Sequence, residues 1–258
     1  MNLKTALITG GATGIGKKIA EELAQSGINL VVNYRSSENE AITLAEGLIA
    51  KYGIRMELIQ GDVSSQEDCI QICEHIKQKN ITIDILIHNA GPYIHERKRL
   101  TDYSFDEWNY LINGNLNAVF YLTRELIPKM REKKWGRVIT IGFDRVETAP
   151  GWVYRSAFAA AKTGLASLTR TLSLEEAENG ITANMVCPGD ITGLWKEMNI
   201  LEATSQVLTS TPVGRPGTGE DISRVVAFLI DNQSSFITGS IIPVTGGVDV
   251  LGKVHNKS

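Results

Sequence analysis

The sequence has few cysteines, no long apolar run and no long run of one charge sign. Three cysteines in 258 residues cannot form the disulfide framework of a small secreted domain. Cys69 and Cys73 lie four residues apart in an expected helix, and Cys187 ends an apolar run. No histidine pattern completes a metal site beside them. We therefore interpret all three as buried thiols and expect no metal.

Membrane and nucleic acid are the next partners that the sequence argues against. No apolar stretch approaches the roughly 20 residues of a spanning helix, and residues 1–4 lead into a short apolar strand rather than a signal peptide. The formal net charge is −3, and the most basic stretch, residues 131–134, is typical of the polar end of a helix. We expect a cytoplasmic protein that binds neither membrane nor nucleic acid.

Short apolar runs alternate with helical periodicity along the chain, which suits one α/β domain over residues 1–258. Such alternation implies a parallel sheet with helices on both faces, because parallel strands need crossover connections. The expected strands lie near residues 6–9, 29–34, 55–60, 83–88, 137–142, 181–187 and 240–244. The expected helices lie near residues 15–26, 38–51, 66–78, 105–132, 155–178 and 219–231. Residues of about 190–216 lack strand character, and we expect them to form a lid over a ligand.

A glycine-rich stretch, Thr-Gly-Gly-Ala-Thr-Gly-Ile-Gly at residues 9–16, joins the first strand to the first helix. Glycines there let the backbone turn tightly, approach a pyrophosphate and direct helix N–H groups at it. The alternative is a tight connection without a ligand, but the position within a βαβ unit favours phosphate binding. The expected contacts are Gly10, Thr13, Gly14, Ile15 and Gly16.

The Gly-x-x-x-Gly-x-Gly spacing resembles that of the short-chain dehydrogenase/reductases, and the resemblance extends over essentially the whole chain. Asp62-Val63 resembles the pair that contacts adenine, and Asn115 resembles the asparagine of the fourth helix. The resemblance assigns further cofactor contacts to Asn89, Ala90, Gly91, Lys162, Pro188, Gly189, Ile191 and Thr192. It implies a Rossmann-type doubly wound sheet of seven parallel strands in the order 3-2-1-4-5-6-7, usually assembled as a homo-tetramer or homo-dimer.

The end of the second strand bears on the choice of cofactor. An NAD site usually offers a carboxylate there, whereas NADP needs positive charge. The sequence has Arg35 and Ser36, with no carboxylate before Glu38, and these two side chains suit a 2′-phosphate. A solvated surface arginine is the alternative, and Thr13 stands where many NADP-using relatives carry a second basic residue. We expect NADP(H) in preference to NAD(H).

Two positions depart from the family pattern. The family's serine position falls on Phe143 and its tyrosine position, four residues before Lys162, falls on Phe158. Neither side chain can donate a proton or a hydrogen bond. Asn115 and Lys162 remain, so the usual Asn-Ser-Tyr-Lys set is incomplete. Because both groups are missing, the sequence is compatible with an enzyme and with a non-catalytic protein.

Tyr154 is the first candidate for a substitute proton donor. On an expected helix it would lie one turn before Phe158, on the same face. It would then be about 12 Å from Lys162 by helical rise. The alternative, an amphipathic residue at a helix start, is the favoured interpretation of Tyr154. Asp144, next to Phe143, is another candidate acid or hydrogen-bonding group, and Arg145, Tyr93 and His95 are expected to line the pocket.

Three functions fit these residues. The best likeness is to 3-oxoacyl-acyl-carrier-protein reductases, which favours a divergent NADP(H)-dependent oxidoreductase acting on a carbonyl or related small or acyl substrate. It would use a non-standard proton donor. An enzyme similar to enoyl reductases is the second possibility. A non-catalytic NADP(H)-binding sensor, scaffold or partner subunit is the third.

Overall fold

A computed structural model describes residues 3–249. Within this range seven strands form one sheet in the order β3-β2-β1-β4-β5-β6-β7, and every neighbouring pair is parallel. The strands are β1 (Thr5–Ile8), β2 (Asn29–Tyr34), β3 (Met56–Gln60), β4 (Ile85–His88), β5 (Gly136–Ile141), β6 (Ile181–Pro188) and β7 (Ile241–Val244). The predicted fold class and strand order are confirmed.

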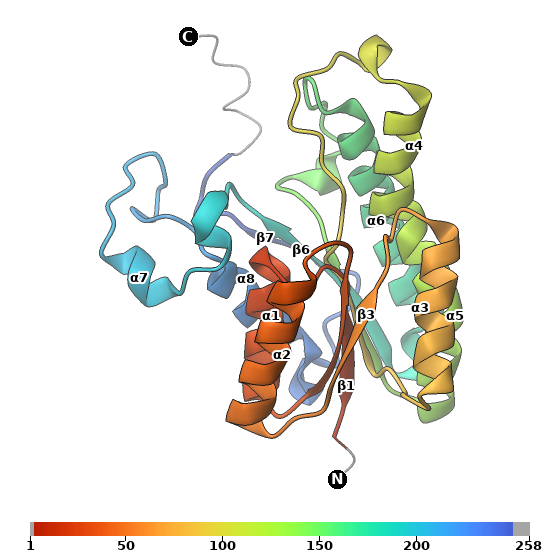
Figure 1. Ribbon diagram of the computed structural model, residues 1–258. Helices are drawn as coiled ribbons and strands as arrows, with labels where there is room; N and C mark the ends of the chain where they lie inside the picture. The colour runs from red at the N-terminus through yellow and green to blue at the C-terminus, as the bar shows by residue number, and fades with distance from the viewer. Residues whose placement is uncertain (1–2, 250–258) are drawn as a thin grey trace.

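The central strands carry apolar side chains on both faces. Every residue of β2, β4 and β5 is buried, as expected where helices cover both sides of a parallel sheet. Figure 1 shows α1 (Gly14–Gln25), α2 (Glu38–Tyr52) and α8 (Gly219–Ile230) on one face. The other face is covered by α3 (Gln66–Gln78), α5 (Ala118–Lys133) and α6 (Ser156–Glu175). The buried apolar residues form two large clusters and one smaller cluster, which contains Phe143.

The helix expected over 105–132 is interrupted, and this expectation is corrected. The chain forms α4 (Phe105–Ile112), a π-helical segment (Asn113–Asn117) and then α5. The Asn115 amide Nδ2 donates to the carbonyl oxygens of Leu111 (2.9 Å) and Pro92 (2.8 Å). A side chain that bonds within the helical ladder widens the turn locally. The interruption fixes Asn115 beneath the carboxyl edge of the sheet.

The segment of about 190–216 forms no strand. It contains a 3-10 turn (Gly193–Lys196) and the short helix α7 (Ile200–Thr204), and Figure 1 shows α7 beyond α1 and α8, away from the sheet. Other 3-10 turns span Leu100–Asp102, Val146–Thr148, Ala177–Asn179 and Asn232–Ser234. Within residues 3–249, no helix combines the length and apolarity needed to cross a bilayer.

Candidate cofactor and active site

The glycine loop lies directly above the carboxyl end of β1. Gly10 and Gly14 adopt φ of +59°, which glycine reaches without a steric penalty. A Cβ on Gly16 would lie 2.2 Å from the carbonyl oxygen of Gly10 and 2.6 Å from Nδ2 of Asn89. That Nδ2 donates to the carbonyl oxygens of Thr9 (3.0 Å) and Gly10 (3.1 Å). The loop is therefore pinned to the start of the β4 loop, and no larger residue fits at Gly16.

The first turn of α1 already binds an anionic group. The backbone N–H of Gly14 donates to Oε1 of Glu197 at 2.7 Å, and Lys17 Nζ lies 2.8 Å from Oε2. Helix amino termini carry partial positive charge, and their free N–H groups bind phosphate oxygens. The Glu197 carboxylate stands in for such an anion. Thr13 lies exposed beside Gly14, so this end of the loop fits the diphosphate of a dinucleotide.

The residues predicted for the adenosine end converge at the carboxyl ends of β2 and β3. The Arg35 side chain is 59% exposed, and its Nη1 lies 3.6 Å from Oδ2 of Asp62. Arg35 also donates to the hydroxyl of Tyr110, a residue of α4. Ser36 is exposed next to Arg35, and Val63 is buried beside Asp62. Sequence reasoning missed Tyr110, because no spacing relates α4 to the end of β2.

Gly91 allows the two remaining polar residues of the predicted site to meet. A Cβ on Gly91 would lie 2.3 Å from Oδ1 of Asn115 and 3.3 Å from Nζ of Lys162. The Asn115 Oδ1 is buried and has no hydrogen-bond partner among the described residues. The same loop is fixed by Thr9, whose Oγ1 accepts from the N–H groups of Asn89 (3.1 Å) and Ala90 (3.0 Å). A buried orphan acceptor usually has a water or ligand as its partner.

Lys162 lies in a dry environment. Its side chain is buried, and Nζ donates to the carbonyl oxygen of Ile141 at 2.8 Å. Desolvation lowers the pKa of Lys162 to about 8. His88 on β4 is also buried, and burial, assisted by the charge of Lys162, lowers its pKa to about 3. Burial raises the pKa of the Cys187 thiol to about 12. His88 and Cys187 are thus both neutral near pH 7, and Lys162, desolvated by burial, releases its proton more readily than an exposed lysine does.

The two phenylalanines belong to a group of packed rings, which we call the aromatic cluster (Tyr93, Phe143, Trp152 and Phe158). Phe143 is only 5% exposed. The ring centroid of Trp152 lies 5.0 Å from that of Phe143 and 6.0 Å from that of Phe158. The Tyr93 ring meets the edge of Phe158 at 5.1 Å. Sequence reasoning did not identify Trp152, which stands in an irregular loop.

Tyr154 does not lie on α6, so the helical placement predicted for it is wrong. The helix begins at Ser156, and Tyr154 occupies the preceding turn with φ of +65°. A left-handed backbone there breaks the helical path, so the distance expected from helical rise does not apply. The Arg97 guanidinium carbon lies 5.3 Å from the centroid of the Tyr154 ring. The Tyr154 carbonyl oxygen accepts from the Tyr103 hydroxyl at 3.3 Å.

The other loop residues predicted near the pocket are held by local contacts. Arg155 donates to the Tyr93 hydroxyl and to the carbonyl oxygen of His95, and the His95 ring stacks edge-on to Tyr93. Arg145 Nη1 lies 2.8 Å from Oδ2 of Asp249. Asp144 is buried next to Phe143. These contacts order the loops at the carboxyl edge without placing a polar side chain at Phe143 or Phe158, the predicted serine and tyrosine positions.

The stretch after β6 borders a pocket of about 340 Å³. The N–H of Gly189 donates to the carbonyl oxygen of Val244 at 2.9 Å, which ties the stretch to β7. Ile191 is buried, whereas Thr192 is exposed. The pocket is lined by Gly189, Ile191, Thr192, Trp195, Leu208 and Val244, among others. The predicted contacts of residues 188–192 therefore lie at the same sheet edge as the glycine loop.

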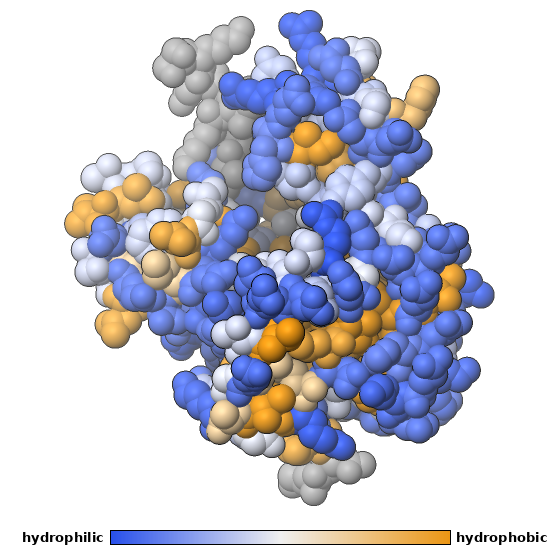
Figure 2. All heavy atoms as spheres, viewed as in Figure 1, coloured by the Kyte–Doolittle hydropathy of each residue, from blue (hydrophilic) through white to orange (hydrophobic). Residues whose placement is uncertain are grey.

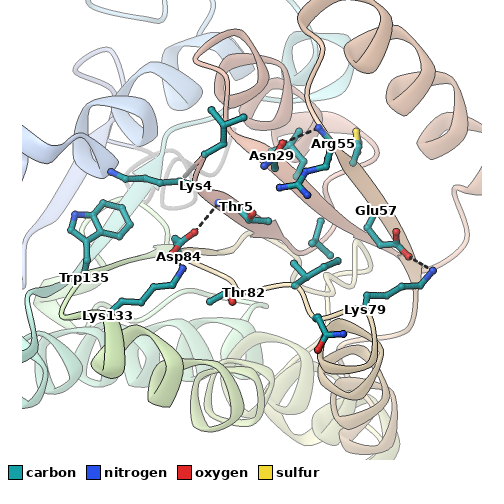
Figure 3. A pocket seen from close by; sticks show the side chains of 16 residues that line it. Lys4, Thr5, Asn29, Arg55, Glu57, Lys79, Thr82, Asp84, Lys133 and Trp135 are labelled. Carbon is teal, nitrogen blue, oxygen red and sulfur yellow. Dashed lines mark hydrogen bonds and ion pairs between the residues drawn. The ribbon is translucent and has the colours of Figure 1, made fainter. Parts of the chain in front are cut away.

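A second groove, of about 750 Å³, lies at the opposite, amino-terminal edge of the sheet (Figure 3). Two of its cations face carboxylates. Lys133 Nζ is 2.6 Å from Oδ1 of Asp84, and Lys79 Nζ is 3.7 Å from Oε1 of Glu57. None of the residues predicted to bind cofactor lines this groove. The residues predicted to bind cofactor therefore do not extend to the amino-terminal edge of the sheet.

A family model described as "Enoyl-(Acyl carrier protein) reductase" matches residues 10–249. The chain belongs to the short-chain dehydrogenase/reductase family. A Bacillus subtilis relative, "Putative oxidoreductase YtkK", is 50% identical over 252 residues, covering 97% of this chain and 98% of its own. A Pseudomonas aeruginosa relative, "3-oxoacyl-[acyl-carrier-protein] reductase FabG", is 37% identical over 246 residues, covering 95% of this chain and 97% of its own. The resemblance to this family and to its 3-oxoacyl reductases is confirmed.

Solved structures of the short-chain dehydrogenase/reductase family agree with the fold. The "putative 3-oxoacyl-reductase from bacillus thuringiensis" is 48% identical and superposes with a TM-score of 0.89, covering 96% of this chain and 99% of that one. A blue fluorescent protein from a metagenomic library, in complex with NADPH, is 30% identical with a TM-score of 0.82, covering 95% and 98% of the two chains. The family consists of oxidoreductases that use a nicotinamide cofactor.

Proposed function

We propose that the protein is an NADP(H)-dependent reductase of a carbonyl group in a 3-oxoacyl-like or related small substrate. The observation that carries this proposal is the line of groups along the carboxyl edge of the sheet. Arg35 would meet the adenosine end of a dinucleotide, the glycine loop its diphosphate, and the pair Asn115–Lys162 its nicotinamide end. The bound cofactor would supply the hydride, and the protein would handle the proton.

The residues present fit such a cofactor. The Gly14 N–H already binds a carboxylate oxygen, and the buried Asn115 Oδ1 lacks a partner among the described residues. In this proposal the cofactor contacts are those expected from the sequence: Gly10, Thr13, Gly14, Ile15, Gly16, Arg35, Ser36, Asp62, Val63, Asn89, Ala90, Gly91, Lys162, Pro188, Gly189, Ile191 and Thr192.

The preference for NADP(H) rests on Arg35. Its guanidinium is largely exposed at the end of β2, and an exposed guanidinium suits a phosphate better than a ribose hydroxyl. Oδ2 of Asp62 lies 3.6 Å from the Arg35 guanidinium. This contact orients the guanidinium and still leaves it open to a phosphate. The NADPH complex of a 30% identical relative supports the same choice.

The proton donor in this proposal is Lys162. Its Nζ lies 5.8 Å from the ring centroid of Phe158 and 3.3 Å from the position of a Cβ on Gly91, and it would donate to a substrate oxygen that approaches within about 3 Å. A hydride adds to the carbonyl carbon, the C=O electron pair moves to oxygen, and that oxygen takes a proton from Lys162. The neutral amine then recovers a proton from solvent. An acid with a pKa near the working pH suits this step.

Tyr154, the donor expected from the sequence, stays an alternative within the proposal. Its turn geometry and its contact with Arg97 separate it from the helix face that carries Phe158. Asn115 would position the cofactor or a water through its free Oδ1. The discriminating variants are Tyr154→Phe and Lys162→Met, which are discussed below.

Two observations bear on the substrate and on the alternatives. Leu194, Leu201 and Val207 are exposed on the segment that carries α7, and Figure 2 shows apolar side chains gathered on that side of the molecule. This surface suits an acyl chain.

The aromatic cluster favours a second function, non-catalytic cofactor binding, because it fills the predicted serine and tyrosine positions with apolar rings. Reduction of an enoyl substrate is a third candidate function, which the description of the matched family model supports.

A homo-tetramer or homo-dimer is part of the proposal. Four phenylalanines lie exposed on the helices and on the loop before β7: Phe105, Phe120, Phe228 and Phe236. Exposed aromatic side chains of this number favour a subunit interface over a bare surface. Light scattering coupled to size-exclusion chromatography would give the oligomeric state.

The test of the cofactor proposal is a fluorescence titration with NADPH and NADH. We expect NADPH to bind more tightly, and Arg35→Ala to weaken NADPH by about 10- to 100-fold while leaving NADH nearly unchanged. Arg55→Ala is the matched control, because Arg55 is exposed at the opposite sheet edge. Absence of binding to both cofactors would overturn the oxidoreductase proposal.

A further inference from the structure

A short segment crosses the site where the cofactor diphosphate is proposed to bind. We call residues 193–204, which include the 3-10 turn and α7, the strap. The carboxylate of Glu197 in the strap accepts a hydrogen bond from the Gly14 N–H at 2.7 Å and lies 2.8 Å from Lys17 Nζ. One oxygen of the Glu197 carboxylate thus accepts from the first N–H of α1, and the other pairs with the ammonium of Lys17.

The rest of the strap is docked by specific contacts on both sides of Glu197. Lys18 Nζ donates to Oδ1 of Asn199 at 2.7 Å, and the Ile200 N–H donates to Glu220 at the start of α8. A Cβ on Gly219 would lie 1.9 Å from the carbonyl oxygen of Lys196. The strap therefore rests directly on α1 and α8, and glycine at the start of α8 is required for this close approach.

The electrostatics of Glu197 match those of a bound phosphate. Partial burial acts to raise the pKa of Glu197, but the hydrogen bonds from Lys17 and the Gly14 N–H outweigh it and hold the pKa below its usual value. The carboxylate is therefore ionised near pH 7. Backbone N–H groups at a helix amino terminus, together with a lysine, are the donors that bind phosphate oxygens.

We propose that the strap is an autoinhibitory element, in which Glu197 occupies the diphosphate position and withdraws when the dinucleotide binds. This inference rests on the proposed function. A phosphate oxygen and a carboxylate oxygen cannot share the same N–H, and their like charges repel at that distance. Binding of the dinucleotide must then offset the free-energy cost of opening the strap. The apparent affinity therefore equals the intrinsic affinity multiplied by the fraction of molecules in which the strap is open.

The first experiment compares NADPH affinity between the wild type and Glu197→Gln, which keeps the size and removes the charge. We expect Glu197→Gln to bind NADPH about three- to tenfold more tightly. Glu22→Gln is the matched control. It removes the same charge from α1, and the Gly14 N–H donates to Glu197 rather than to Glu22. Equal affinity in the wild type and Glu197→Gln, or weaker binding by the variant, would overturn the proposal.

Hydrogen–deuterium exchange gives a second readout that does not depend on turnover. Saturating NADPH should raise the exchange of amides in residues 193–204 and lower that of Gly14, because the strap leaves as the diphosphate arrives. Protection of both regions on binding would contradict withdrawal of the strap.

Inorganic pyrophosphate separates this proposal from the proposed function. If neither the wild type nor Glu197→Gln binds NADPH, the proposed function fails, and pyrophosphate still tests the strap. The anion should bind more tightly to Glu197→Gln than to the wild type and should protect the Gly14 amide. Equal or absent binding of pyrophosphate to both proteins would then overturn the strap proposal as well.

Discussion

The ring of Phe143 packs on the indole of Trp152, with their centroids 5.0 Å apart and their planes tilted by 52°. Phe143 is the predicted position of the family's serine, and Phe158, the next ring of the aromatic cluster, is the predicted position of its tyrosine. Both predicted positions thus belong to one apolar packing unit. Replacing these two rings tests whether they account for the loss of ordinary carbonyl reductase activity.

The double variant Phe143→Ser/Phe158→Tyr should gain ordinary carbonyl reductase activity with NADPH. Phe158→Tyr adds a phenol near Lys162, and Phe143→Ser adds a hydrogen-bond donor to the substrate oxygen. The serine also leaves a cavity, which should lower the free energy of unfolding by about 3 kcal/mol. Steady-state assays on small ketones give the activity, and urea denaturation gives the stability.

Phe158→Tyr alone serves as the control for the double variant, because it changes one polar atom and keeps the ring. It should fold like the wild type and show less activity than the double variant. A stable double variant that binds NADPH but reduces no ketone would contradict the assumption that only these two groups are missing.

A proton donated by Lys162 gives a specific pH profile. With a pKa of about 8, kcat/KM should be level below that pH and should fall about tenfold per pH unit above it, because only the ammonium donates. Lys162→Met should abolish turnover, with NADPH binding measured separately. Tyr154→Phe should leave the profile unchanged. Loss of turnover in Tyr154→Phe would instead restore Tyr154 as the donor.

Acid should destabilise the protein through His88. The pKa of this histidine is about 3 in the folded protein against 6.5 for the free side chain. The unfolded chain therefore binds one more proton between these values, so stability is lost as pH falls below 6.5. The contribution is about 1.4 kcal/mol per pH unit, or about 2 kcal/mol at pH 5. Urea denaturation at pH 7 and pH 5 measures it.

His88→Asn is the control for this prediction, since asparagine does not titrate. The variant should lose less stability between pH 7 and pH 5 than the wild type does. Equal losses in both proteins would show that another group causes the acid sensitivity.

Gly16→Ala should disrupt the glycine loop. The added Cβ would lie 2.2 Å from the carbonyl oxygen of Gly10, so the loop must shift, at a cost of about 1–3 kcal/mol. NADPH binding should fall by at least about tenfold, because the N–H groups of α1 move with the loop. Thermal unfolding and the NADPH titration are the measurements.

Gly47→Ala is the matched control, because Gly47 lies exposed in α2 and a Cβ added there would meet no atom of another described element within 4 Å. Alanine there should raise stability by about 0.5–1 kcal/mol through its helix propensity. Equal effects of the two substitutions would contradict the steric argument for Gly16.

Much of the architecture could be predicted from local patterns. Apolar runs separated by helical periodicity located all seven strands, and a parallel order follows because each crossover carries a helix. The glycine spacing placed the loop at the start of α1. The absence of a hydroxyl at Phe143 and Phe158 is a property of the residues themselves. These features depend on chain neighbours, so the sequence suffices to predict them.

Tertiary structure decided the features that depend on distant residues. Asn115 widens α4–α5 into a π segment because its amide bonds Pro92, 23 residues away. Tyr154 leaves the helix because of its left-handed turn. Glu197 reaches Gly14 across 183 residues of chain, and no periodicity links them. Residue types and short spacings determined which groups are available. Packing of remote segments determined which of these groups meet, because contacts between residues distant in sequence do not appear in local sequence periodicity.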